Sequence, residues 1–196
     1  MPLNIPNFVT LLRIALIPLF VVVYYWPHPQ AAMMATIIFV AAALTDWLDG
    51  YLARRLGQYS SFGEFLDPVA DKLMIAAALV MLIADSRVHA GLVWDNRLFG
   101  VVVLIILGRE IAVSALREWM AELGKRSRVA VSVVGKFKTG SQMTAIGFLI
   151  WREPLFGLPI FRIGEWLLYI AAALTLWSMI VYLRAAWPLL SGTAKP

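Results

Sequence analysis

Four aspartates stand close together in a sequence that is otherwise strongly apolar: Asp46, Asp49, Asp67 and Asp71. An aspartate near the centre of a membrane helix costs roughly 2.5 to 3.5 kcal/mol on insertion scales, so four of them require a compensating positive charge. Carboxylate oxygens are hard ligands that suit Mg²⁺ or Mn²⁺ and suit zinc or copper poorly. We therefore predict that these four side chains bind divalent metal ions, with two ions in the site.

The chemistry that such a site favours is displacement at phosphorus. Two metal ions can clamp a pyrophosphate, neutralise the phosphate oxygens and stabilise the leaving group. A carboxylate that remains available can accept the proton of the attacking nucleophile. The aspartate quartet therefore predicts a displacement at phosphorus, in which a nucleophile attacks a metal-bound phosphate.

The residues around the first aspartate pair support an anionic ligand. Asp46 and Asp49 are three residues apart in a predicted helix, and Gly50 and Ala53 continue the same face. These two small residues allow a ligand to approach the backbone, and Arg54 follows Gly50 by one helical turn, where it can meet an anion. The alternative for Arg54 is that it only sets the orientation of the chain in the membrane.

The second aspartate pair lies at the predicted start of the next helix. Asp67 is a typical N-cap residue and Pro68 is favoured at the first helical position, so we expect the helix to begin there, with Asp71 one turn in. The segment 55–66 then forms the turn, in which Gly63 supplies flexibility. The alternative for Asp67 is that it serves only as a helix cap.

The elements that position these residues are membrane helices. The chain has 196 residues, 61% of them hydrophobic and 15% charged, with a mean hydropathy of +0.79, which excludes an ordinary soluble domain. It has no cysteine and therefore no thiolate metal site. We predict an all-α protein, a polytopic six-helix bundle that forms a single domain over residues 1–196. The six predicted spans are Phe8–Trp26, Ala31–Leu56, Pro68–Ala84, Leu98–Leu123, Val129–Trp151 and Ile160–Trp187.

Basic residues are distributed unequally between the two sides of this predicted bundle. All but four of the 17 lysines and arginines fall in or near one side, and the exceptions are Arg87, Arg97, Arg152 and Arg162. Because the basic side of a membrane protein faces the cytoplasm, we expect the aspartates to face the cytoplasm too.

A second polar cluster is a candidate phosphate-binding site. Arg109 and Arg117 are eight residues apart on one face of the predicted fourth helix, and Lys136 and Lys138 lie in the fifth. Two guanidiniums with one or two ammonium groups can hold a dianionic phosphate. Two alternatives remain open: the arginines pair with the neighbouring glutamates, or the basic residues set topology and bind anionic headgroups.

The aspartate segment resembles the signature of the CDP-alcohol phosphotransferases. The matching pattern is Asp46-x-x-Asp49-Gly50-x-x-Ala53-Arg54, then eight residues, then Gly63-x-x-x-Asp67-x-x-x-Asp71. The resemblance implies that a CDP-linked lipid donates its phosphatidyl group to an alcohol and releases CMP, with a divalent metal as cofactor. It implies that all four aspartates contact metal and that Asp71 is also the catalytic base. It further implies CDP-diacylglycerol contacts at Asn7, Thr10, Gly50, Ala53, Arg54 and Ser60.

Four further segments resemble family members whose acceptor is sn-glycerol 3-phosphate. They are Asn4-Ile-Pro6-Asn7-x-x-Thr10-x-x-Arg13, Gly108-Arg109-Glu110, Arg117–Ser127 and Gly135-Lys136-x-Lys138-Thr139. The resemblance implies that CDP-diacylglycerol and sn-glycerol 3-phosphate give phosphatidylglycerophosphate and CMP, with the acceptor held by Arg109, Arg117, Lys136 and Lys138. It also implies a bacterial inner-membrane protein that contacts lipids, binds no nucleic acid and forms a homodimer.

Two other functions compete with this interpretation. The same donor could serve another acceptor, such as inositol phosphate, serine or phosphatidylglycerol, because the aspartate signature is shared across acceptors. A divalent-cation transporter also carries carboxylates inside the membrane. Transport requires polar residues through the whole depth of the membrane, whereas here the acidic residues gather at one predicted helix end and the outer halves are apolar.

Overall fold

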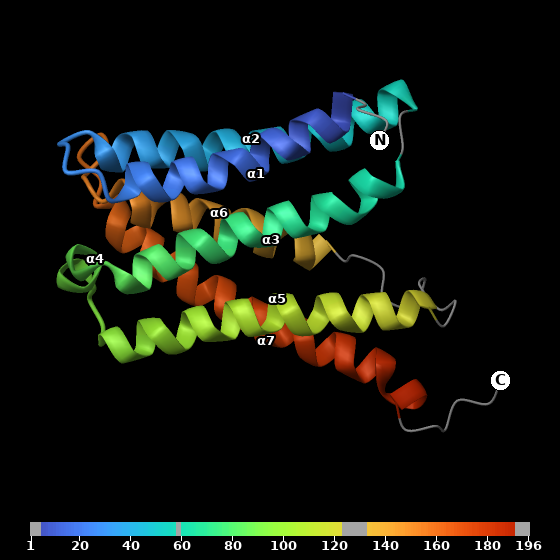
Figure 1. The fold of residues 1–196 in the computed structure, drawn as a ribbon. Helices are drawn as coiled ribbons and strands as arrows, with labels where there is room; N and C mark the ends of the chain where they lie inside the picture. The colour runs from blue at the N-terminus through green and yellow to red at the C-terminus, as the bar shows by residue number, and fades with distance from the viewer. Residues whose placement is uncertain (1–4, 58–59, 123–132, 191–196) are drawn as a thin grey trace. The chain divides into compact units, whose positions relative to one another are not determined.

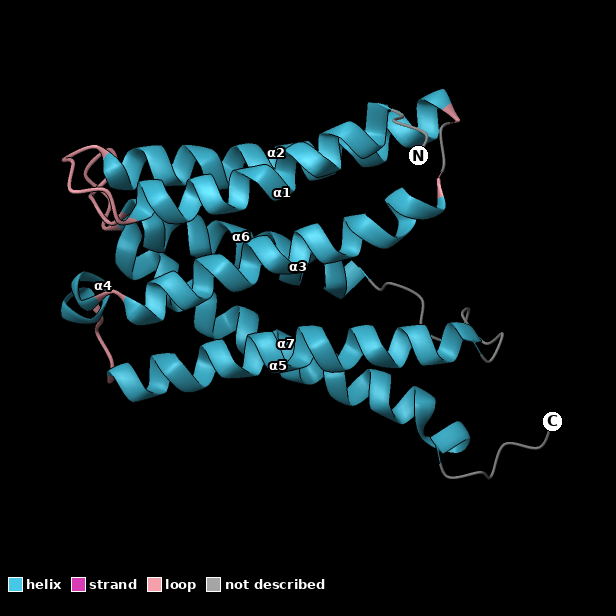
Figure 2. Cartoon of the chain, in the orientation of Figure 1, coloured by secondary structure: helices cyan, strands magenta, loops and turns pink. Residues whose placement is uncertain are grey.

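A computed structural model of the chain describes residues 5–57, 60–122 and 133–190. These residues form helices joined by short connections, with no β-strand among them (Figures 1 and 2), so the prediction of an all-α protein is confirmed. The helices are α1 (Ile5–Tyr24), α2 (Ala31–Leu56), α3 (Ser61–Ala84), α4 (Ser86–Gly91), α5 (Asn96–Glu122), α6 (Val133–Trp151) and α7 (Ile160–Leu190).

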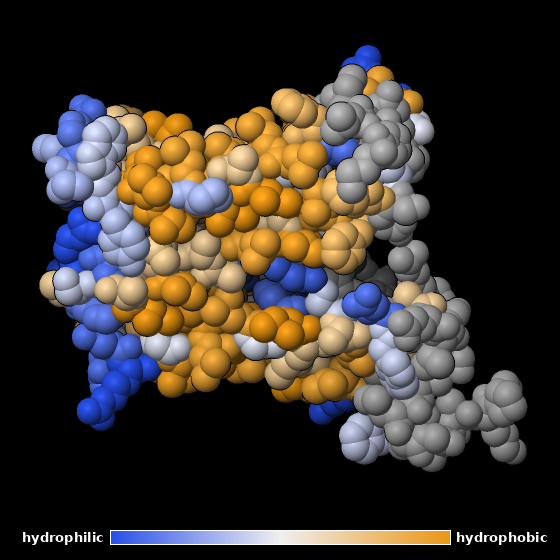
Figure 3. Space-filling view, viewed as in Figure 1, coloured by the Kyte–Doolittle hydropathy of each residue, from blue (hydrophilic) through white to orange (hydrophobic). Residues whose placement is uncertain are grey.

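Three of the described helices are long and apolar enough to cross a membrane. The candidate spans are Asn7–Tyr24 in α1, Asn96–Ala121 in α5 and Ile160–Arg184 in α7, and α2 contributes a shorter apolar stretch, Ala31–Asp46. Apolar side chains cover much of the length of the helices in Figure 3. These helices indicate a membrane protein, and the number of six spans stays a prediction.

Helix α3 begins earlier than the sequence pattern predicted. Ser60, in extended backbone conformation, is the N-cap, and its Oγ accepts a hydrogen bond from the Gly63 N–H at 3.0 Å. Pro68 therefore lies inside the helix, and the prediction that Asp67 caps it was wrong. The connection after α2 is also much shorter than the predicted segment 55–66, because α3 already begins at Ser61. Helix α2 ends at Leu56, and Gly57 is its C-cap, with a φ of 63° that suits glycine.

A short helix that we did not predict follows α3 directly. Helix α4 spans Ser86–Gly91, and Asp85 is its N-cap, with a carboxylate oxygen that accepts a hydrogen bond from the Arg87 N–H at 2.9 Å. Six residues are too few to show a helical hydrophobic period, so the cap residue is the only local signal for this helix.

The chain divides into two compact units. The first comprises Met1–Leu92 with Ile146–Gly164, and the second comprises Val93–Ala145 with Glu165–Pro196. In the first unit α1 contacts both α2 and α3, while α2 and α3 contact each other much less, so α1 lies between the two helices that carry the aspartates (Figure 1). The prediction of a single domain stays a prediction.

The packing of α1 on α2 explains why these helices stay together. Phe20 of α1 is completely buried, and its ring lies 5.8 Å from that of Tyr24 and 6.3 Å from that of Phe39 in α2. Ala35 and Ala42, seven residues apart on α2, are also buried. Small residues on one face let two helix backbones approach closely, which is how membrane helices gain packing energy.

In the second unit, a buried carboxylate joins the start of α7 to the segment before α5. Glu165 is fully buried, and its carboxylate accepts hydrogen bonds from the Val93 N–H at 2.9 Å and the Tyr169 hydroxyl at 2.8 Å. The rings of Trp94 and Trp166 pack edge to face, with 6.0 Å between the ring centres. This end of the second unit is therefore held by a satisfied polar group and an aromatic pair.

Candidate active site

Helix α1 contacts one aspartate from each of its two neighbouring helices. The Arg13 Nη1 donates to Asp46 Oδ1 of α2 at 2.6 Å, and the Thr10 hydroxyl donates to Asp67 Oδ1 of α3 at 2.6 Å. Thr10 and Arg13 are three residues apart and share one face of α1. One aspartate from each predicted pair, Asp46 and Asp67, therefore contacts the same face of α1.

Arg13 is the site residue whose role the sequence analysis missed. Its side chain is 1% exposed, while that of its partner Asp46 is 47% exposed. A buried guanidinium is very costly unless it is paired, and the short charge-assisted hydrogen bond to Asp46 offsets that cost. The signal was present in the sequence, because an arginine inside an apolar segment requires a partner of opposite charge.

The second contact of α1 with the α3 region lies at Asn7. The Ser60 hydroxyl donates to Asn7 Oδ1 at 2.9 Å, and Asn7 is 3% exposed. A Cβ atom placed on Gly63 would lie 2.5 Å from the same Asn7 oxygen, closer than real Cβ contacts. A side chain at this position would therefore have to displace Asn7. Gly63 lies inside α3, so the prediction that it gives the turn flexibility was wrong.

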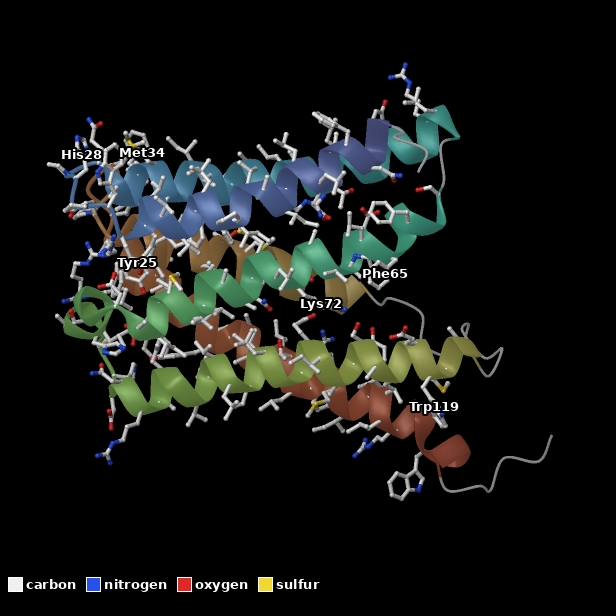
Figure 4. All side chains as sticks on the ribbon, in the orientation of Figure 1. Tyr25, His28, Met34, Phe65, Lys72 and Trp119 are labelled. Atoms are coloured by element: carbon white, nitrogen blue, oxygen red, sulfur yellow. The ribbon has the colours of Figure 1, made fainter. Side chains whose placement is uncertain are left out.

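The second aspartate pair lies on one face of α3. Asp67 and Asp71 are four residues apart on α3 and partly exposed, so they share a face of that helix. Figure 4 labels Phe65 and Lys72 on this half of α3. Among the described side chains, no group of three or more acidic, histidine or cysteine residues is close enough to hold a metal ion.

Seven predicted site residues have side chains outside the described part of the structure, so their roles stay predictions. Asp49, which completes the first aspartate pair, is one of them. The full set is Asp49, Gly50, Ala53, Arg54, Arg117, Lys136 and Lys138.

Arg109, a predicted acceptor contact, lies in the second unit. Its side chain is 9% exposed, pairs with Glu110 at 2.9 Å and donates to the Ser178 hydroxyl of α7 at 3.0 Å. Its guanidinium also lies 5.8 Å from the centre of the Tyr182 ring. Pairing with the neighbouring glutamate, one of the two alternatives for this residue, is therefore present in the structure, and phosphate binding stays a prediction.

The packing at Gly63 leads to a first testable result. We expect Gly63→Ala to displace Asn7 and break its hydrogen bond to Ser60, which lowers the melting temperature by several degrees, since about 1 kcal/mol shifts it by 2 to 4 °C in a domain of this size. The control is Gly100→Ala in α5, where an added Cβ meets nothing within 4 Å. Thermal unfolding in detergent measures both, and equal melting temperatures would contradict the predicted clash.

The chain matches known proteins over nearly its whole length. The sequence model of the CDP-alcohol phosphatidyltransferase family matches residues 3–177. A protein from Haemophilus influenzae is 50% identical over 186 residues, which cover 95% of both chains. One from Yersinia enterocolitica is 52% identical over 187 residues, 95% of this chain and 97% of the relative. Both are named CDP-diacylglycerol:glycerol-3-phosphate 3-phosphatidyltransferase.

The family match covers both the aspartate segment and the face of α1 that contacts it, and the relatives extend over nearly the whole chain. Identity near 50% over this length is far above what unrelated membrane helices of similar composition share. The family generally uses divalent metals. The chain therefore belongs to the CDP-alcohol phosphatidyltransferase family.

Proposed function

We propose that this protein transfers the phosphatidyl group of CDP-diacylglycerol to sn-glycerol 3-phosphate and releases CMP, giving phosphatidylglycerophosphate. The observation that carries this proposal is the identity of about 50% to relatives named for that reaction, over 95% of the chain. The aspartate signature, complete in this sequence, supports the donor half of the reaction.

In this reaction the primary hydroxyl of glycerol 3-phosphate attacks the phosphorus atom that carries the diacylglycerol. Asp71 accepts the proton of that hydroxyl as the new oxygen–phosphorus bond forms. The bond from the same phosphorus to the oxygen of CMP breaks, and Arg54 meets the charge that develops on the leaving nucleotide. The one-step displacement leaves the phosphatidyl group on the acceptor.

Carboxylate oxygens, the donors that the two helices carry, are the ligand type that Mg²⁺ and Mn²⁺ prefer. Mg²⁺ or Mn²⁺, held by Asp46, Asp49, Asp67 and Asp71, supplies charge neutralisation at the diphosphate when bound. The contacts from α1 support this assignment, because Arg13 and Thr10 each engage an Oδ1 atom and thereby orient the carboxylates. We propose Arg13 and Thr10 as positioning residues for the metal ligands.

Thr10 and Asn7 were predicted to contact the nucleotide, and their structural contacts suggest a more specific role. Thr10 is 1% exposed and hydrogen-bonded to Asp67, and Asn7 is 3% exposed and hydrogen-bonded to Ser60. Both side chains thus hold the aspartate-bearing α3 region against α1. We propose that Gly50, Ala53 and Arg54 form the main nucleotide contacts, with Ser60 near them.

For the acceptor we propose that Arg109, Arg117, Lys136 and Lys138 hold the phosphate of glycerol 3-phosphate. A phosphate bound by guanidinium groups gains charge-assisted hydrogen bonds worth about 1.5 to 3 kcal/mol each. Arg109 already forms an ion pair with Glu110 and a hydrogen bond to Ser178. Binding of the acceptor phosphate at this residue therefore competes with the Glu110 ion pair.

A substitution at Arg109 tests the acceptor site. We expect Arg109→Gln to raise the KM for glycerol 3-phosphate about 10- to 100-fold and to leave the KM for CDP-diacylglycerol within twofold, because one charge-assisted hydrogen bond is lost. Steady-state CMP release with each substrate varied in turn measures this. Ser178→Ala is the control, since it removes the Arg109 partner on α7 and keeps the charge. An equal effect of both substitutions would assign Arg109 to packing of α5 on α7.

The proposed location is the bacterial inner membrane, with the aspartates facing the cytoplasm, and the proposed assembly is a homodimer. The excess of basic residues on the aspartate side supports this orientation. Because the chain has no cysteine, Ser86→Cys and Leu56→Cys provide single labelling sites at opposite ends of the first unit. In intact cells a membrane-impermeant maleimide should label only the Ser86→Cys variant, and the reverse pattern would invert the orientation.

The reaction itself is tested by CMP release from CDP-diacylglycerol in detergent. Glycerol 3-phosphate, inositol 1-phosphate and serine are offered in turn, each with and without EDTA. We expect release only with glycerol 3-phosphate and its loss in EDTA, because the carboxylate site depends on divalent ions. Release with another acceptor would reassign the substrate, and Mg²⁺ flux in liposomes without CMP release would favour transport.

A further inference from the structure

A cavity lies in the first unit at the end of α3 far from the aspartates. Asp71 and Asp85 are 14 residues apart along α3, which corresponds to roughly 21 Å at about 1.5 Å per residue. The cavity has a volume of about 200 Å³, well above the roughly 10 to 15 Å³ that one water molecule needs. We call it the arginine pocket, and its lining residues are Arg87, Gly91, Arg152, Pro154, Pro159, Phe161 and Arg162.

One buried carboxylate holds two of the three arginines in place. Asp85 is 5% exposed and accepts hydrogen bonds from Arg87 Nε and Nη2, both at 2.9 Å, and from Arg152 Nη1 at 3.1 Å. The Tyr24 hydroxyl donates to the same carboxylate at 2.9 Å. Burial alone would raise the pKa of Asp85, but the hydrogen bonds from Arg87 and Tyr24 outweigh it and the pKa lies below its usual range. Asp85 is therefore ionised at neutral pH.

The backbone at Arg152 is unusual for an arginine. Its φ is 67° at the end of α6, a left-handed position that normally takes glycine and costs other residues about 1 kcal/mol. The side chain is only 13% exposed, donates from Nε to the Ile150 carbonyl at 3.3 Å and lies 5.4 Å from the centre of the Tyr24 ring. The guanidinium is thus fixed in orientation at the cavity wall.

The third arginine differs from the other two. Arg162 is exposed, as Arg87 is, but none of the ion pairs between described side chains includes Arg162. Glu153, the acidic residue next to Arg152 in the sequence, does not line the cavity. With Asp85 as the carboxylate that neutralises one of the three guanidiniums, the cavity carries an excess of positive charge and suits an anion.

The rest of the cavity wall is apolar. Phe161 packs against Gly91 so closely that a Cβ atom there would lie 2.9 Å from the ring. Pro154 and Pro159 complete this side of the cavity. A ligand with a phosphate at one end and an apolar or glycerol portion at the other matches both parts of the wall.

The position of the cavity relative to the candidate spans indicates where such a ligand comes from. The span in α1 ends at Tyr24, followed by the exposed aromatic residues Tyr25 and Trp26, and the span in α7 begins at Ile160 beside the pocket-lining Phe161. Figure 4 labels Tyr25 at the same end of the first unit as α4. Exposed aromatic residues at span ends are typical of the depth of lipid headgroups.

We propose that the arginine pocket binds the phosphate group of a membrane phospholipid, in the leaflet opposite to the aspartates. Arg87 and Arg152, fixed by Asp85, present guanidinium edges to the phosphate, and Arg162 closes over it from the first turn of α7. Phe161 and the two prolines contact the glycerol portion. This site does not depend on the proposed transferase reaction, because it shares no residue with the candidate active site.

The test compares phosphatidic acid with diacylglycerol, two lipids that differ only in the phosphate. Binding of fluorescent analogues to the detergent-solubilised protein is measured with saturating CDP present, which has no lipid portion and occupies the nucleotide part of the candidate active site. We expect phosphatidic acid to bind and Arg162→Gln to weaken that binding roughly tenfold, the loss of about one charge-assisted hydrogen bond. Diacylglycerol should bind weakly to both proteins.

Arg97→Gln is the matched control, because it removes an exposed arginine that lies outside the cavity, and it should change the affinity less than twofold. CMP release should be unchanged in Arg162→Gln, which shows that the variant is folded. Two results would overturn the proposal: equal affinity of Arg162→Gln and the unsubstituted protein, or complete displacement of phosphatidic acid by millimolar inorganic phosphate, which identifies a site for free anions. Arg87→Gln provides a second variant and should weaken binding to at least the same extent.

Discussion

Replacing Asp71 with asparagine is expected to lower kcat for CMP release by about 10²- to 10⁴-fold, the range that a general base contributes. Asparagine has nearly the same shape as aspartate but cannot accept a proton from the acceptor hydroxyl, and it is a weaker metal ligand. Binding of CDP-diacylglycerol should survive in part, because the other three aspartates remain. Steady-state kinetics with glycerol 3-phosphate and equilibrium binding of the donor separate the two effects.

The control for this substitution is Asp95→Asn. Asp95 is exposed and accepts a hydrogen bond from the Arg97 N–H at 2.9 Å, a contact that asparagine can keep. The Asp95→Asn variant loses the same charge but outside the candidate active site. Its kcat should therefore stay within twofold of that of the unsubstituted protein. Full activity of Asp71→Asn would remove Asp71 from the role of base and shift that role to another group.

The second large effect is expected at Arg13. We predict that Arg13→Met lowers kcat/KM about 10- to 100-fold and raises the Mg²⁺ concentration needed for half-maximal activity by a similar factor, as loss of a group that orients a metal ligand does. The 2.6 Å hydrogen bond to Asp46 Oδ1 disappears, and the carboxylate becomes free to rotate. Methionine fills much of the buried volume, so the packing of α1 is largely kept.

A loss of stability could imitate this result, and the metal titration separates the two explanations. Breaking a buried ion pair can cost 3 to 5 kcal/mol, but Asp46 is about half exposed and can be rehydrated, so we expect roughly 1 to 2 kcal/mol here. Arg13→Lys keeps the charge and should recover part of the metal affinity. If Arg13→Met lowers the melting temperature while the Mg²⁺ dependence stays the same, Arg13 has a structural role only.

The sequence alone predicted the helical class and several of the helix ends. Helix α2 begins and ends at the predicted residues Ala31 and Leu56, and α6 ends at Trp151 as predicted. These boundaries could be predicted because long apolar runs and the turn residues between them are local properties of the chain. The pattern of aspartates also identified the family, since its residues lie within one short stretch of sequence.

The start of α3 shows where local patterns fail. Ser60 and Asp67 are both good N-cap residues, and Pro68 after Asp67 made the later start the more typical pattern. The earlier start is supported by the contact of Ser60 with Asn7, 53 residues away in the chain. A proline in the eighth helical position costs one backbone hydrogen bond. It is tolerated because the longer helix gains packing against α1, which offsets that cost.

What the sequence determined by itself is which charged residues the membrane helices carry, and that each of them requires compensation. Only the tertiary structure decided which groups provide it. Arg13 pairs with Asp46 at a separation of 33 residues, Thr10 with Asp67 at 57, and Asp85 with Arg152 at 67. No local pattern encodes such partners, because they depend on how α1, α2, α3 and the end of α6 pack. That packing is set by the shapes of many small apolar side chains acting together.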